Sequence, residues 1–143
     1  MKTPIAVLLT VVALSSFNTA FAGMTDIEGD NLKEQAANGS SSAMKKIQHA
    51  ANSGDAVAEF ELGILYKNGQ GVPQDYAQAA SWYRKAADQG VAVAQLHLGT
   101  LYFKGQGVPQ DSAQAEYFFE KAAAQGYQGA ARKLRILRTG SDQ

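Results

Sequence analysis

The chain of 143 residues contains no cysteine, which excludes disulfide bonds, thiol nucleophiles and metal sites with cysteine ligands. Its 13 basic and 13 acidic residues give a formal net charge of zero, so the whole molecule has no field that would attract nucleic acid. Its two histidines, His49 and His97, lack the spacing of a metal motif such as H-E-x-x-H. We therefore expect no metal, no cofactor and no nucleic-acid partner.

Residues 1–22 have the three parts of a secretory signal sequence. Lys2 supplies a positive charge, an apolar run extends from Ile5 to Leu14, and Ala20-Phe21-Ala22 forms a small-x-small cleavage site. A single membrane anchor is the alternative, but the run is shorter than the ~20 apolar residues that span a bilayer. We expect cleavage after Ala22, no stable membrane anchor afterwards, and a periplasmic or secreted protein.

The centre of the chain is one unit of 36 residues written twice. When residues 55–90 are placed above residues 91–126 without a gap, 22 of the 36 columns are identical. A fixed period of this length is typical of a solenoid, in which each unit buries its apolar face only by stacking on its neighbours.

Each unit predicts two helices, because apolar residues recur at spacings of three and four along one helical stripe. The first-helix stripes are Ala58, Leu62, Leu65 and Tyr66, and then Ala94, Leu98, Leu101 and Tyr102. The second-helix stripes are Ala79, Trp82, Tyr83 and Ala86, and then Ala115, Phe118, Phe119 and Ala122. These stripes predict an antiparallel helix pair in each unit.

Turn and cap residues mark the ends of these helices. The sequence Gly-Gln-Gly-Val-Pro at 69–73 and 105–109 ends each first helix, because proline cannot continue a helix interior. Asp75 and Asp111 each precede a glutamine by three residues. This spacing predicts a capping box, in which the aspartate accepts from the new helix and the glutamine reaches back to the cap. Gly90 and Gly126 then close the second helices.

These residues resemble the Sel-1-like repeats, a branch of the tetratricopeptide-like helical repeats. The pattern A-x-x-x-L-G-x-L-Y-x-x-G-x-G-V-x-x-D-x-x-x-A-x-x-W-[YF]-x-K-A-A-x-x-G is complete in the first unit, and the second departs only by Phe118 in the tryptophan position. The resemblance implies an all-α fold, a short right-handed αα solenoid, and an interaction scaffold without chemistry of its own.

The remaining segments complete the predicted domain organisation. Residues 23–42 are a flexible or weakly helical N-terminal segment, two readings that the sequence leaves open. The repeat domain spans residues 43–138, and residues 139–143 form a tail. Its parts are a half repeat at 43–54, full repeats at 55–90 and 91–126, and a capping helix at 127–138.

No set of residues indicates an enzyme. The Gly-Gln-Gly turns follow a helix, whereas a phosphate-binding loop follows a strand. Glu59 and Glu61 are two residues apart, so on a helix they point to different faces. We therefore expect a protein with no catalytic residues.

The resemblance implies a binding surface on the concave face, which the first helix of each pair lines in this superfamily. Carried over by alignment, the partner-binding positions are Val57, Phe60, Ile64, Lys67, Val93, Leu96, Thr100, Phe103, Lys104 and Arg132. An apolar centre with a basic edge suits a peptide or partner helix that has hydrophobic anchors and acidic groups. Alternatively, so short a solenoid forms no open groove, and Phe60, Ile64 and Leu96 pack against neighbouring helices.

A basic cluster of Arg132, Lys133, Arg135 and Arg138 has no acidic partner within its own segment. It is either a docking patch or the solvated polar face of a terminal helix, where cations are favourable. We prefer the second interpretation.

Two functions remain from the sequence. The first is a periplasmic interaction module that binds another protein, as a monomer or with weak self-association through its exposed ends. The alternative, implied by the resemblance alone, is an immunity protein that occludes a toxic effector such as a phospholipase.

Overall fold

The computed structural model describes residues 26–140, and the predicted signal sequence at 1–22 lies outside them. The regular elements in this range are all α-helices, which confirms the predicted all-α solenoid. They are α2 (Asp26–Ala37), α3 (Ser41–Asn52), α4 (Ala56–Asn68), α5 (Tyr76–Asp88), α6 (Ala92–Lys104), α7 (Ser112–Ala124) and α8 (Gln128–Thr139). The segment left open at 23–42 contains α2, and α3 begins at Ser41, two residues before the predicted half repeat at 43–54. None of the described helices is long and apolar enough to cross a membrane.

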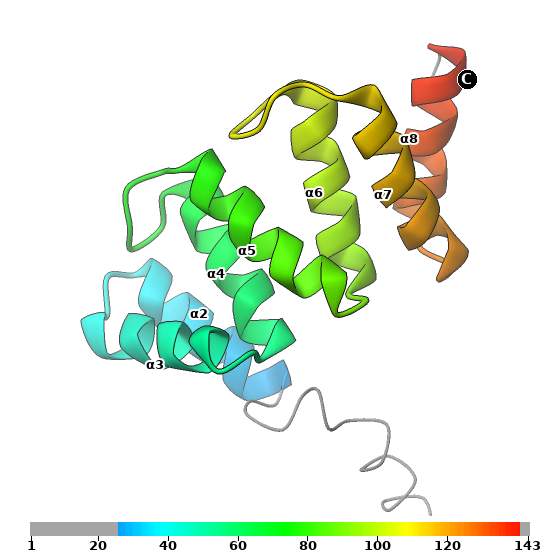
Figure 1. The fold of residues 1–143 in the computed structure, drawn as a ribbon. Helices are drawn as coiled ribbons and strands as arrows, with labels where there is room; N and C mark the ends of the chain where they lie inside the picture. The colour runs from blue at the N-terminus through cyan, green and yellow to red at the C-terminus, as the bar shows by residue number, and fades with distance from the viewer. Residues whose placement is uncertain (1–25, 141–143) are drawn as a thin grey trace, which may run out of the picture.

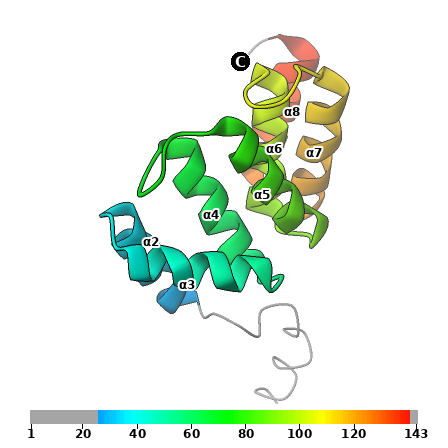
Figure 2. The same ribbon diagram turned by 60° about the vertical axis from the view of Figure 1, so that its left-hand side comes forward.

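The helices stack as consecutive antiparallel pairs. Figure 1 shows α2 and α3 at one end, the pairs α4/α5 and α6/α7 in the middle, and α8 at the other end. The turned view in Figure 2 keeps the same order. Contacts are most extensive within the two full pairs and then between the second helix of one pair and the first helix of the next. The 36-residue period therefore repeats in space.

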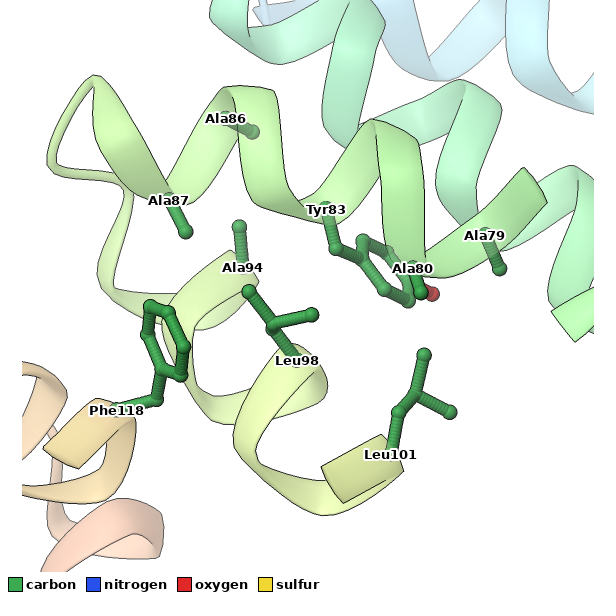
Figure 3. Packing of buried hydrophobic residues seen from close by; sticks show 9 residues of the cluster. All are labelled: Ala79, Ala80, Tyr83, Ala86, Ala87, Ala94, Leu98, Leu101 and Phe118. Atoms are coloured by element: carbon green, nitrogen blue, oxygen red, sulfur yellow. The ribbon is translucent and has the colours of Figure 1, made fainter. Parts of the chain in front are cut away.

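Two clusters of buried apolar side chains hold the stack together. The first core cluster joins α2, α3 and α4 through Ala36, Ala43, Met44, Ile47, Ala51, Ala58, Leu62 and Leu65. The second core cluster joins α5, α6 and α7 through Ala79, Ala80, Tyr83, Ala86, Ala87, Ala94, Leu98, Leu101 and Phe118. Figure 3 shows Leu98 and Leu101 of α6 pointing towards α5, with Phe118 approaching from α7. The many alanines let neighbouring backbones lie close together.

The Leu-Gly pair of each first helix sets how closely the second helix of the same repeat approaches. A Cβ atom on Gly63 would lie 2.6 Å from ring carbons of Tyr83, and one on Gly99 would lie 2.8 Å from ring carbons of Phe119. Both rings are almost fully buried. Each glycine thus leaves the space that the aromatic ring of its own repeat occupies.

The predicted aspartate caps are present. Asp75 Oδ1 accepts from the backbone N–H groups of Ala77 and Gln78, both at 3.0 Å, and Asp111 repeats this geometry. The prediction that the glutamine side chain reaches back to the cap residue is wrong. The N–H of Asp75 donates instead to the carbonyl of Tyr66 at 2.9 Å. This backbone bond joins the new helix to the end of the previous one.

The glycine-rich turn of the second repeat folds onto the preceding repeat. Gly107 has φ of 72°, and a Cβ atom there would lie 2.2 Å from the backbone carbon of Tyr76 at the start of α5. Only glycine combines a positive φ with so close a backbone approach. The turn residues therefore have a structural role, which explains them without a bound phosphate.

Candidate functional site

The ten expected binding residues lie on the three first helices α4, α6 and α8. We call the surface of these three helices the first-helix face. Seven of the ten side chains are half-buried, and Phe103, Lys104 and Arg132 are exposed. The face thus divides into a covered part near α4 and a more open part between α6 and α8.

On α4, the expected binding residues pack against neighbouring helices. Val57 contacts the first core cluster, whereas Phe60 and Ile64 contact the second. The ring centroid of Phe60 lies 5.7 Å from that of Tyr83 and 5.6 Å from that of His97. Such contacts are what we expect if these side chains pack against neighbouring helices and do not line an open groove. They leave the side chains only partly accessible to a partner.

His97 fills the junction between α4 and α6, a role that the sequence alone does not reveal. Its ring stacks on Tyr83, with centroids 5.2 Å apart. Burial, together with the positive charges of Lys67 and Lys133, lowers the pKa of His97 from 6.5 to about 4. His97 is therefore neutral at pH 7 and acts as a packing ring beside cationic groups.

The remaining expected residues lie along α6 and the start of α8. Leu96 faces Gly129 of α8, at 3.6 Å from the position of a Cβ atom on that glycine. The hydroxyl of Thr100 donates to the carbonyl of Leu96 at 2.8 Å, which leaves little donor capacity for a ligand. Val93 is half-buried, so the open part of the face begins further along α6.

An open pocket of about 160 Å³ lies between α6, α7 and α8. It is lined by Phe103, Phe119, Lys133 and Ile136. The sequence places Phe103 in the binding row, Phe119 in the core and Lys133 in the basic cluster, but it does not single out Ile136. The repeat period could have grouped these four residues, because each lies 36 residues after a residue at the junction of α4 and α6. Phe103 corresponds to Lys67, Phe119 to Tyr83, Lys133 to His97 and Ile136 to Thr100.

The basic cluster of α8, which has no acidic partner within its own segment, is partly paired with residues of another helix. Arg138 Nε lies 2.6 Å from Glu116 Oε1, and its guanidinium also contacts Glu120. Both glutamates belong to α7, so the pairs tie the last helix to the preceding one. This supports the preferred interpretation of a terminal helix with a charged outer face.

The buried carboxylates of α4 have structural partners. Glu59 accepts from the side-chain amide of Gln89 at 2.8 Å, and Glu61 lies 3.1 Å from Lys33 Nζ of α2. Glu61 therefore joins α4 to α2, and Glu59 joins α4 to the residue that follows α5. Among the side chains that the structure describes, at residues 31–140, no group of three or more histidine, aspartate or glutamate residues could hold a metal ion.

Comparison with known proteins gives the same architecture. The Sel1 repeat matches residues 56–91 and 92–127 of this chain. A protective antigen of uropathogenic Escherichia coli strains that displays an SLR fold is 38% identical, with a TM-score of 0.68 over 78% of this chain and 25% of its own. A Sel1 repeat protein from Oxalobacter formigenes is 32% identical, with a TM-score of 0.70 over 79% of this chain and 46% of its own.

Cysteine rich protein B of Helicobacter pylori is 23% identical, with a TM-score of 0.60 over 71% of this chain and 88% of its own, which shows a common fold. The chain thus spans less than half the length of the Escherichia coli and Oxalobacter proteins. No curated protein matches it. Because the repeat covers half of the chain in two adjacent copies, this protein belongs to the Sel1 repeat family.

Proposed function

We propose that this protein is a non-catalytic interaction module of the periplasm, which binds a partner protein through its first-helix face. Sel1 repeat proteins generally mediate protein–protein interactions and are generally not enzymes. The periplasmic location rests on the signal sequence at 1–22. The face, the partner and the location together make the proposal specific to this chain.

One observation carries the choice of face: the open part between α6 and α8 combines an exposed aromatic residue with cationic neighbours. The side chain of Phe103 is 39% exposed, and exposed Lys104 follows it on α6. Lys133 lines the pocket next to Phe103. Interfaces are enriched in aromatic anchors of this kind, and charged groups around them select the partner.

The test is affinity capture with the tagged protein from the envelope of its own host. Phe103→Ser removes the aromatic anchor on the first-helix face. Tyr117→Ser is the matched control, because Tyr117 is 47% exposed but lies on the second helix α7. We expect one partner to be retained by the wild type and the control and lost from the Phe103 variant.

Equal retention of the partner by both variants would place binding on another surface and contradict the proposal. Circular dichroism must show the same helix content in all three proteins. The identity of the captured protein separates the two roles that the sequence leaves open, because a toxic effector would make the protein an immunity factor and an envelope component would make it a scaffold.

A further inference from the structure

The pocket between α6, α7 and α8 lies at a junction where the residue in the column of His97 is no longer an aromatic ring. At the junction of α4 and α6, the ring of His97 covers Tyr83 of α5. One repeat later, Lys133 stands in the column of His97 and Phe119 in the column of Tyr83. Lys133 has no ring to stack on Phe119 as the imidazole of His97 stacks on Tyr83, and an open pocket lies at this junction.

The size and lining of the pocket suit one apolar group. Phe119 is 1% exposed, whereas Phe103 and Ile136 still reach solvent. A closed apolar cavity of roughly 150 Å³ is sufficient to hold a benzene molecule. A pocket of about 160 Å³ therefore has room for one aromatic or branched aliphatic side chain.

The positive charge at the pocket favours a bound apolar group that has an acidic group next to it. Lys133 is the charged residue of the lining, and it has no ion pair or hydrogen bond with the side chains described at residues 31–140. The charges of Lys67 and Lys133 both act on His97. A carboxylate placed beside the apolar group would meet uncompensated positive charge here.

We propose that this pocket is the specificity pocket of the partner-binding face, and that it takes an apolar side chain of the partner whose neighbouring carboxylate pairs with Lys133. The proposal rests on the function proposed above and adds the chemistry of the bound segment. A hydrophobic anchor next to an acidic residue is then the feature by which a partner is recognised.

The experiment uses two small probes that differ only in charge, 3-phenylpropionate and 3-phenylpropanamide. Each is titrated into the isotope-labelled protein, and amide shifts in α6 and α8 are followed by NMR. We expect saturable shifts for both probes near Phe103 and Lys133, with about two- to fivefold tighter binding of the carboxylate, the range of a partly exposed ion pair. Absence of saturable shifts at these residues would overturn the proposal.

Two variants separate the parts of the pocket. Lys133→Gln should make the two probes bind equally, whereas Lys104→Gln, on an exposed lysine outside the lining, should keep the preference. Lys133→His restores the residue of the preceding repeat, and its ring should cover Phe119 and abolish binding of both probes without loss of fold. A carboxylate preference retained in Lys133→Gln would contradict the role of Lys133.

The same variants distinguish this proposal from the broader one. If Phe103→Ser loses the captured partner while the probes do not bind, the interaction face stands and the pocket inference fails. If Phe103→Ser and Lys133→His both retain the partner, the face itself is wrong.

Discussion

The imidazole of His97 lies nearly parallel to the phenol ring of Tyr83, with 5.2 Å between the centroids and 20° between the planes. The pair joins α6 to α5, and Phe60 of α4 contacts both rings. Three helices from two repeats therefore meet at a residue that titrates near neutral pH in an unfolded chain.

The first prediction is that His97 makes stability fall in acid. Because the folded pKa of about 4 lies below the ordinary 6.5, the unfolded chain binds the proton more tightly. The stabilisation is complete above about pH 6.5, is lost as pH falls towards and below 4, and amounts to roughly 3 kcal/mol. Denaturant titrations across this pH range should show that the free energy of unfolding falls as pH falls. His97→Phe should reduce this dependence on pH.

His49 provides the control for this titration. It lies on an exposed position of α3, and His49→Gln should leave the pH slope as in the wild type. The charged groups that act on His97 are Lys67 of α4 and Lys133 of α8. A slope that survived in His97→Phe would have another origin.

The second prediction concerns the Leu-Gly pairs. Gly63→Ala and Gly99→Ala should each lower the free energy of unfolding by about 1–3 kcal/mol, because the new methyl group overlaps the ring of Tyr83 or Phe119. Gly129→Ala is the matched control on α8, where the nearest atom to the new methyl group lies 3.4 Å away. Alanine is the better helix former, so this control should be neutral or stabilising. Equal thermal melting temperatures for all four proteins would rule out the close approach.

The sequence predicts the fold of the repeats well because their determinants are local. Stripe spacing, the aspartates at helix starts and the glycines at helix ends lie within one unit, and the structure places Asp75 and Asp111 as caps. The open or covered state of the first-helix face depends instead on the residue one repeat further along. Phe60 of the first repeat is half-buried against His97 of the second, and Phe103 lines a pocket together with Lys133, which stands in the column of His97 one repeat later.

The sequence alone also does not predict ion pairs and hydrogen bonds between residues that are far apart along the chain. Arg138 has no acidic neighbour in its own helix, yet α7 brings Glu116 and Glu120 to it. Likewise, the spacing of Glu59 and Glu61 does not show that both side chains are buried and paired with distant residues. Such pairings follow from the stacking angle of the repeats, which no single unit encodes.

The third prediction tests the caps. Asp75→Ala should lower the free energy of unfolding by about 1 kcal/mol, because two N–H groups at the start of α5 lose their acceptor. Asp75→Asn should recover most of the loss, since an amide oxygen also caps a helix. Thermal unfolding followed by circular dichroism measures both. A loss that Asn failed to recover would assign the effect to the charge and not to the hydrogen bonds.

The last prediction is that Glu59→Gln stabilises the protein. Glu59 is 4% exposed, and burial raises the pKa of its carboxyl group above 4.5. In the next repeat the same column holds Gln95, whose amide donates to the carbonyl of Ala87 and accepts from Gln125. A glutamine at 59 can make the equivalent pair of bonds, whereas an ionised carboxylate can only accept.

We expect a gain of about 1 kcal/mol at pH 7, the net contribution of one hydrogen bond, and a loss of similar size for the reciprocal change Gln95→Glu. The raised pKa means that the folded state holds the proton of Glu59 more tightly than the unfolded chain does. In the wild type, the free-energy cost of burying an ionised Glu59 therefore disappears as pH falls through the folded pKa towards 4.5. The stability gained by Glu59→Gln should shrink over the same pH range. A gain that stayed constant with pH would show that ionisation of Glu59 does not contribute to it.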